Sequence, residues 1–168
     1  MDASPAGGDP TSLLFVCLGN ICRSPLAEGV FQHLAEQKGM GEQFRVESAG
    51  TGSWHVGDAP DERSQEVAAR HGISLDSRAR QVRPEDLEEF DWVVVMDRDN
   101  LRTLERMRDA RGGDRPIHLL RSFDDQGDGD EVPDPYYGGP GGFDDVYEMV
   151  RRSCENLLEH VQSSRQTA

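Results

Sequence analysis

Residues 13–25 read LLFVCLGNICRSP, and this stretch decides the fold that we expect around it. Its first four residues are apolar without interruption, which is typical of a buried strand, here expected over Ser12–Cys17. A segment with apolar residues at helical spacing follows over Leu26–Lys38. Cys17 is therefore expected at the end of a strand, with a short loop joining it to the start of a helix.

The rest of the chain continues the same alternation of strand-like and helix-like segments. Further strands are expected at Phe44–Ser48, Trp92–Met96 and Ile117–Leu120. Further helices are expected at Asp61–His71, Pro84–Glu89, Asn100–Arg108 and Phe143–Gln162. Strands that alternate with helices predict a doubly wound α/β domain with a parallel sheet. Ligands of such sheets bind beyond the carboxyl ends of the strands, where Cys17 is expected to lie.

Composition limits the possible classes of function. The chain has 168 residues, enough for one domain with its own core, and a formal net charge of −14, which disfavours nucleic acid and anionic membranes as partners. We find no secretory signal and no apolar run of membrane-spanning length, so we expect a cytoplasmic protein. Three cysteines do not make a disulfide framework. We expect a disordered lead-in over residues 1–11, a single domain over 12–162 and a tail over 163–168.

The loop after Cys17 has the composition of a phosphate site. Backbone N–H groups at a helix N-terminus bind anions well, and Arg23 adds a planar fork for two phosphate oxygens. The same positive field favours the thiolate form of Cys17, which is a strong nucleophile. Ser24 is expected to cap the helix, with Pro25 in its first turn, and can donate a hydrogen bond to the sulfur. The expected phosphate-binding residues are Leu18, Gly19, Asn20, Ile21, Cys22, Arg23 and Ser24.

A leaving alkoxide or phenoxide needs a proton, and Asp134 is the best candidate for the general acid. Two prolines fix the backbone on either side of it, and two tyrosines follow. The preceding carboxylates of residues 124–131 favour its protonated form. That acidic segment is otherwise expected to be a solvated loop, and it lacks the glutamate that an EF-hand requires. We expect no metal site and no cofactor.

The sequence CLGNICRSP at residues 17–25, together with DPYY at 134–137, resembles the low-molecular-weight protein tyrosine phosphatases. The resemblance covers about Leu13–Glu159. It implies a single-domain, flavodoxin-like, four-stranded parallel sheet with helices on both faces. It further implies that Cys17 is the nucleophile, Arg23 the phosphate clamp, and Asp134 the proton donor and later the base for water.

The resemblance also implies supporting roles. Three residues match positions that brace the loop: Asn20, Ser48 and His71. Three aromatic side chains are expected in the substrate pocket: Trp54, Tyr136 and Tyr137. Cys22 matches a second loop cysteine that forms a reversible disulfide with Cys17 under oxidation. The implied partners are phosphotyrosine proteins, a bacterial tyrosine autokinase among them, and phosphate or another oxyanion in the active site.

Three alternative functions compete with a tyrosine phosphatase. An arsenate reductase shares the fold and the loop but needs relay cysteines, and residues 70–97 contain none. A phosphoarginine phosphatase typically has threonine in place of Ile21, and Tyr136–Tyr137 suit an aryl ring better. A non-catalytic phosphotyrosine-binding module should have lost Cys17 or Asp134, and this chain keeps both.

Overall fold

A computed structural model describes residues 9–126, 129–135 and 142–167 of the chain. Four strands form one parallel sheet in the order β2-β1-β3-β4. The strands are β1 (Thr11–Cys17), β2 (Phe44–Gly50), β3 (Trp92–Val95) and β4 (His118–Leu119). This topology confirms the expected flavodoxin-like sheet. Within the described ranges, no helix is long and apolar enough to cross a bilayer.

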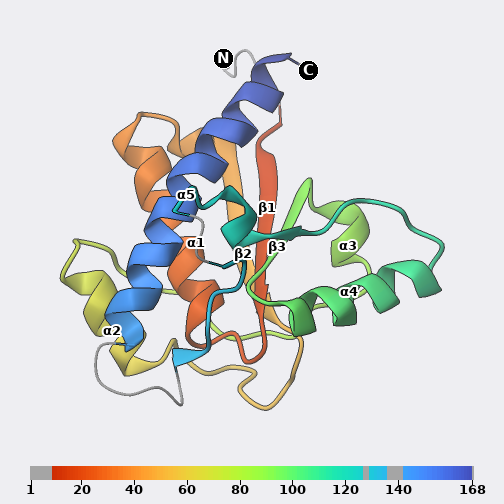
Figure 1. Cartoon of the computed structure of the whole chain (residues 1–168), viewed down its shortest axis with the longest axis horizontal. Coiled ribbons are helices and arrows are strands. Elements are labelled where there is room, and N and C mark those ends of the chain that lie inside the picture. Colours follow the sequence, from red (N-terminus) through yellow and green to blue (C-terminus); the bar gives the residue numbers. More distant parts are fainter. Residues whose placement is uncertain (1–8, 127–128, 136–141, 168) are drawn as a thin grey trace.

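Helices cover both faces of the sheet (Figure 1). Five α-helices are present in the described residues: α1 (Arg23–Gln37), α2 (Glu62–Ala69), α3 (Asp86–Glu89), α4 (Arg98–Ala110) and α5 (Gly142–Thr167). Two 3₁₀ turns, η2 (Gly41–Gln43) and η3 (Leu120–Phe123), complete these elements. Helices α1, α2 and α5 lie on one side of the sheet, and α3 and α4 lie on the other (Figure 1).

The alternation of side chains along β1 explains the two-sided core. Leu13 and Phe15 face the apolar cluster that includes side chains of α1 and α5. Leu14 and Val16 face a second cluster, which Leu104 of α4 completes. All of these side chains are fully buried, so β1 is apolar at every position between the layers.

The strand order places a topological switch point between β1 and β3. Both neighbours of β1 run parallel to it, and Cys17 ends β1 opposite Gly50 of β2. Ligands of doubly wound sheets bind in the crevice outside the carboxyl ends of the strands at this point. The loop after Cys17 and the residues after β3 therefore meet where a ligand is expected.

Most element boundaries differ by a few residues from the sequence-based expectation, and two of these differences have a clear structural cause. Helix α1 begins at Arg23, and its N-cap is Cys22 rather than Ser24, because the Ser24 hydroxyl is engaged by the loop instead. Helix α5 does not end at Gln162 but continues to Thr167. Its last turn is attached to the start of the chain's first strand, because Arg165 donates hydrogen bonds to the Asp9 carbonyl and to Thr11 Oγ1.

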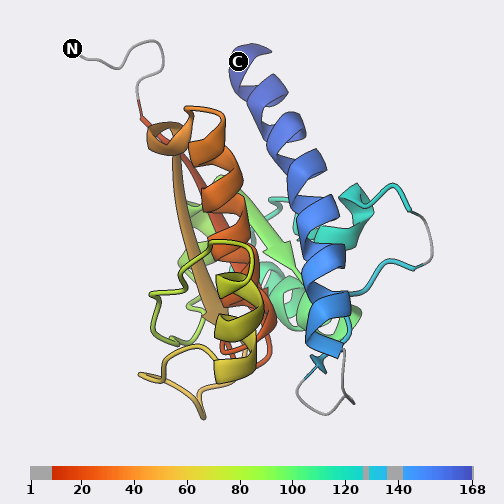
Figure 2. The same ribbon diagram turned by 90° about the vertical axis from the view of Figure 1, so that its left-hand side faces the viewer.

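The two ends of the domain consequently lie at the same end of the molecule. Figures 1 and 2 show that β1 begins beside the last turns of α5. Residues 1–8 of the expected lead-in lie outside the described residues, whereas Thr11 already belongs to β1.

Candidate active site

The loop after β1 curls around the sulfur of Cys17. Asn20 has a φ of +60°, the left-handed conformation that asparagine tolerates better than most side chains. This conformation turns the Asn20 backbone N–H toward Cys17 Sγ, 3.3 Å away. Cys17 itself is 2% exposed, so the sulfur lies at the bottom of the loop.

Glycine at position 50 allows the loop to pack closely against the end of β2. A Cβ on Gly50 would lie 2.8 Å from the Leu18 carbonyl oxygen and 3.1 Å from the Gly19 carbonyl carbon. Two hydrogen bonds join the segments here, from Thr51 N to the Cys17 carbonyl and from Gly52 N to the Leu18 carbonyl, each 2.9 Å long. Any larger residue at position 50 would therefore push the loop away.

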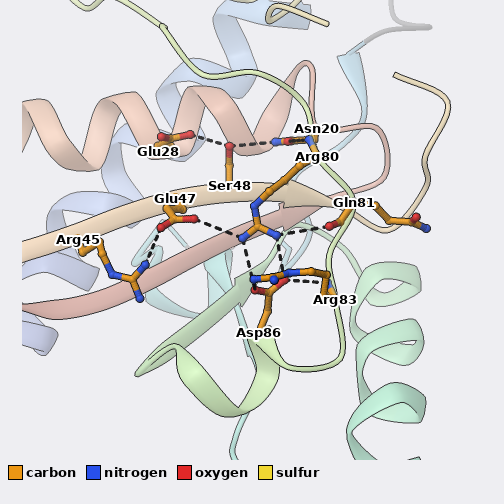
Figure 3. Close-up of polar contacts among 9 residues, drawn as sticks. All are labelled: Asn20, Glu28, Arg45, Glu47, Ser48, Arg80, Gln81, Arg83 and Asp86. Carbon is orange, nitrogen blue, oxygen red and sulfur yellow. Dashed lines mark hydrogen bonds and ion pairs between the residues drawn. The ribbon is translucent and has the colours of Figure 1, made fainter. Parts of the chain in front are cut away.

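A buried chain of hydrogen bonds runs from the sulfur to α1 and β2. Asn20 Nδ2 donates to Ser24 Oγ at 2.8 Å and to Ser48 Oγ at 2.9 Å. Because Ser24 Oγ accepts from Asn20, its own hydrogen is available to Cys17 Sγ, 3.0 Å away, while the Ala49 carbonyl at 3.4 Å is the more distant acceptor. Ser48 in turn donates to Glu28 Oε1 at 2.6 Å (Figure 3).

The carboxyl of Glu28, at the end of this hydrogen-bond network, is partly buried. Burial raises the pKa of the Glu28 carboxyl, while the hydrogen bond from Ser48 opposes that shift. Glu28 lies on α1, one turn after Ser24, so the helix places both residues on the side that faces β2. The network thus connects the loop to α1 and β2 without using solvent-exposed groups.

Arg23 is held rigidly beside the loop. Its side chain is 3% exposed, and Nη1 donates to Asp97 Oδ2 at 2.8 Å and to the Val132 carbonyl at 2.9 Å. Asp97 follows β3 and is also the N-cap of α4, so its carboxylate is fixed at the carboxyl edge of the sheet. Burial opposes the charge of Arg23, but Cys17 and Asp97 outweigh it and raise the pKa of Arg23. Two acceptors therefore fix one end of the guanidinium.

Asp134 lies beside the guanidinium of Arg23. Its Oδ2 is 3.8 Å from Arg23 Nη2, and its side chain is 32% exposed. The preceding Val132 anchors the segment, because its N–H donates to the Met96 carbonyl at 2.8 Å while its own carbonyl accepts from Arg23. Arg23 and Asp134, which are 111 positions apart in the chain, thus lie close together at the carboxyl edge of the sheet.

Cys22, the second loop cysteine, lies in surroundings that disfavour its thiolate form. Burial, with the nearby Asp61 and Cys17, raises the pKa of Cys22 to about 12. Asp61 is close because its backbone N–H donates to the Ile21 carbonyl at 2.7 Å. All three cysteines of the chain are free thiols. Cys22 is thus a neutral thiol at physiological pH.

Three large apolar side chains in the loop and in the segment after β2 are exposed. Trp54 is 69% exposed, Val56 57% and Leu18 42%. The Trp54 ring lies directly on Gly52, where an added Cβ would come within 1.4 Å of a ring carbon. The backbone of Gly52 therefore supports one part of the Trp54 ring, while much of the side chain stays exposed. The other two expected pocket residues, Tyr136 and Tyr137, lie outside the described residues.

Of the three residues expected to brace the loop, the structure places two in contact with it and one away from it. Asn20 and Ser48 contact the loop as anticipated. His71 does not: its ring stacks on Tyr147 of α5 with centroids 3.9 Å apart, and in the described part of the chain it makes no hydrogen bond to the loop. The reason is its place at the far end of α2, which packs against α5.

Sequence reasoning missed two further partners of the loop, Glu28 and Arg80. The backbone N–H of Arg80 donates to Asn20 Oδ1 at 3.0 Å. The helical spacing from Ser24 to Glu28 could have indicated the first of them. Arg80 lies in a segment without regular structure, 60 positions after Asn20, and no local pattern marks it.

The fold and the site together define an α/β protein with a loop that curls around a cysteine sulfur at the end of β1 and leads to an arginine in the first turn of α1. Residues 12–167 match the model of the family described as low molecular weight phosphotyrosine protein phosphatase, and the chain belongs to this family.

Relatives from distant organisms share nearly the whole domain. The low molecular weight protein-tyrosine-phosphatase YfkJ of Bacillus subtilis is 44% identical over 158 residues, which is 92% of this chain and 98% of the relative. Its crystal structure superimposes with a TM-score of 0.87 at 42% identity, covering 94% of this chain and 98% of the other. The human low molecular weight phosphotyrosine protein phosphatase is 44% identical over 149 residues, 88% of this chain and 94% of the relative.

One structural neighbour is named for a different substrate. The crystal structure of a Drosophila arginine phosphatase has a TM-score of 0.83 and 36% identity, and covers 89% of this chain and 96% of its own. The shared fold is therefore compatible with more than one phosphorylated side chain in these relatives.

Proposed function

We propose that this protein hydrolyses phosphotyrosine in protein substrates through a cysteinyl-phosphate intermediate on Cys17. The observation that carries the proposal is the surroundings of the sulfur. Cys17 Sγ receives hydrogen bonds from the Asn20 backbone N–H and from Ser24 Oγ, at the start of a helix. These donors, with the helix dipole, stabilise a thiolate at the place where a phosphate would sit.

In the first step, the loop N–H groups and the guanidinium N–H groups of Arg23 that Asp97 and Val132 do not engage hold the phosphate oxygens. Cys17 Sγ attacks phosphorus, a P–S bond forms, and the P–O bond to the tyrosine ring breaks. Asp134 donates its proton to the departing phenolate oxygen. The positive field that stabilises the transition state comes from Arg23 and the backbone, so the step requires no metal.

In the second step, the Asp134 carboxylate removes a proton from water, which attacks phosphorus. The P–S bond breaks, inorganic phosphate leaves, and the electron pair returns to Cys17 Sγ. The Ser24 hydroxyl, 3.0 Å from the sulfur, can donate its hydrogen to the leaving thiolate and so lower its energy. Arg23 keeps its orientation through both steps because Asp97 and the Val132 carbonyl hold Nη1.

The substrate assignment rests on the mouth of the site and on the relatives. The exposed ring of Trp54, fixed over Gly52, offers a face on which a phenyl ring can stack. The Bacillus subtilis and human relatives described above both carry the name of a protein tyrosine phosphatase. Phosphotyrosine proteins are therefore the proposed partners, a tyrosine autokinase among them. We place the activity in the cytoplasm, where the free thiols stay reduced.

The test compares a phosphotyrosine peptide with a phosphoarginine peptide, in EDTA, for the wild type and Cys17→Ser. We expect turnover of phosphotyrosine that EDTA does not affect and that Cys17→Ser abolishes, with phosphate still bound by the variant. Preference for phosphoarginine would keep the mechanism and overturn the substrate. Residual normal activity of Cys17→Ser would overturn the mechanism.

A further inference from the structure

Arg80 reaches the phosphate-binding loop from a segment that has no role in the proposed chemistry. Residues 73–85 form no helix and no strand apart from one bridge, between Gln81 and Gly50. Within this segment the Arg80 backbone N–H donates to Asn20 Oδ1 at 3.0 Å, and the Arg80 carbonyl accepts from Gly50 N at 2.8 Å. The Arg80 backbone thus joins the loop to the end of β2.

The Arg80 side chain is anchored on a fully buried carboxylate. Nη1 lies 3.0 Å from Asp86 Oδ2, and Nη2 lies 3.4 Å from Glu47 Oε1 (Figure 3). The Asp86 side chain is 0% exposed and also accepts from the backbone N–H of Arg83 at 2.7 Å. Although burial opposes ionisation, the hydrogen bonds from Arg80 and Arg83 lower the pKa of Asp86 below its usual value. The anchor is therefore ionised at neutral pH.

The contact with Arg80 determines which way the Asn20 amide faces. An amide has an oxygen that only accepts and a nitrogen that only donates. With Oδ1 held by Arg80 N–H, Nδ2 must face Ser24 and Ser48. In the opposite orientation Oδ1 would face both hydroxyls, and the Ser24 hydrogen would turn toward Asn20 and away from Cys17.

We propose that Arg80, anchored by Asp86, is a positioning residue for Cys17, acting through the orientation of the Asn20 amide. The proposal rests on the assignment of Cys17 as the nucleophile. It requires only contacts between described residues: Asp86 fixes Arg80, Arg80 fixes Asn20, and Asn20 leaves the Ser24 hydrogen for the sulfur. Arg80 touches neither the phosphate nor the reacting atoms.

The experiment substitutes Arg80 or Asp86 and measures the reactivity of the Cys17 sulfur. Arg80→Met removes the guanidinium, Arg80→Lys keeps the charge, and Asp86→Asn keeps the shape of the anchor without its charge. Arg83→Met is the matched control, because Arg83 Nη2 also pairs with Asp86 at 3.1 Å but its side chain is 59% exposed. Each variant is assayed for kcat and KM, for thermal unfolding, and for the rate of Cys17 alkylation by iodoacetate at neutral pH, with the site identified by mass spectrometry.

We expect Arg80→Met to lower kcat about tenfold and Cys17 alkylation severalfold, with KM changed less than about twofold. Arg80→Lys should recover part of both losses, and Asp86→Asn should resemble Arg80→Met. Arg83→Met should stay within about twofold of the wild type in kcat and alkylation.

Folded Arg80→Met with unchanged alkylation and kcat would overturn the proposal, and so would an equal loss in Arg83→Met. If Arg80→Met does not fold, kcat and Cys17 alkylation of Arg80→Lys and Asp86→Asn test the proposal instead. Alkylation does not require turnover. A wild type that hydrolyses neither phosphopeptide would therefore contradict the proposed function, while the alkylation rates would still show whether Arg80 acts on Cys17.

Discussion

The guanidinium of Arg23 is the side chain whose geometry most directly prepares the site for an anion. Asp97 and the Val132 carbonyl occupy Nη1, so the remaining N–H groups point away from these acceptors with little freedom. Little conformational entropy is then lost when phosphate binds, since the fork is already oriented. A lysine ammonium could occupy the place of Nη1, but it has no second nitrogen and no planar fork to offer to phosphate while those two acceptors hold it.

Arg23→Lys should therefore lower kcat/KM for aryl phosphates by about a hundredfold or more, although the charge is kept. Steady-state kinetics of the wild type and the variant measure the effect. Arg63→Lys is a suitable control, because Arg63 pairs with Asp61 near the loop and has a side chain that is 47% exposed. A loss below about threefold in Arg23→Lys would show that charge alone is sufficient.

Asp134→Asn tests the assignment of the proton donor. The acid is needed most when the leaving oxygen is basic, so the loss in kcat/KM should grow as the pKa of the leaving phenol rises. A series of substituted phenyl phosphates measures this slope for the wild type and the variant. Equal losses across the series would remove Asp134 as the acid, whatever the size of the loss.

The join between η3 and α5 is the clearest case in which one buried charge connects two elements. Asp124, whose side chain is fully buried, pairs with Arg121 of η3 at 3.0 Å and with Arg152 of α5 at 3.1 Å. Arg121 also donates to the Glu131 carbonyl at 3.1 Å, just before the segment that carries Asp134. This cluster therefore holds the acidic loop at both ends.

Asp124→Asn should lower the free energy of unfolding by about 3 kcal/mol at pH 7, because two arginines lose their charged partner in a buried position. Burial opposes ionisation of Asp124, but Arg152 and other donors outweigh it and lower its pKa. Its stabilisation is therefore complete above the ordinary aspartate value and is lost as the pH falls below about 4.

Urea unfolding of the wild type and Asp124→Asn at several pH values checks this prediction, and the exposed neighbour gives the control variant Asp125→Asn. The difference between the wild type and Asp124→Asn should shrink as the solution is acidified. A difference that stays constant from pH 7 to pH 3 would contradict it.

Across the whole molecule, the features that the sequence predicts are those that follow from local patterns of apolar and polar residues. The apolar run before Cys17 predicts β1, and the alternation of elements predicts the parallel sheet and the edge at which the site lies. The first turn of α1 was less predictable, because Ser24 is a good N-cap by type, yet its hydroxyl is engaged by Cys17 and Asn20. A side chain with several possible partners takes the one that tertiary structure offers.

The contacts that Glu28 and Arg80 add to the hydrogen-bond network of the loop were beyond the sequence alone. They join α1 and an irregular connection to Ser48 and Asn20, and the sequence analysis assigned a role only to the last two. The position of His71 in the chain did not indicate which neighbour its ring contacts, and that neighbour is Tyr147 of α5. The end of α5 was missed because its last residues are polar, while Arg165 secures that turn on β1.

The measurement that tests the central claim most directly is to trap the intermediate. The wild type is mixed with a phosphotyrosine peptide, quenched within milliseconds and digested, and the phosphorylated residue is located by mass spectrometry. The account predicts phosphate on the sulfur of Cys17, accumulating further in Asp134→Asn if water attack is slowed, and absent from Cys17→Ser. Phosphate on Ser24 or Cys22, or turnover with no phosphoenzyme on Cys17, would contradict it.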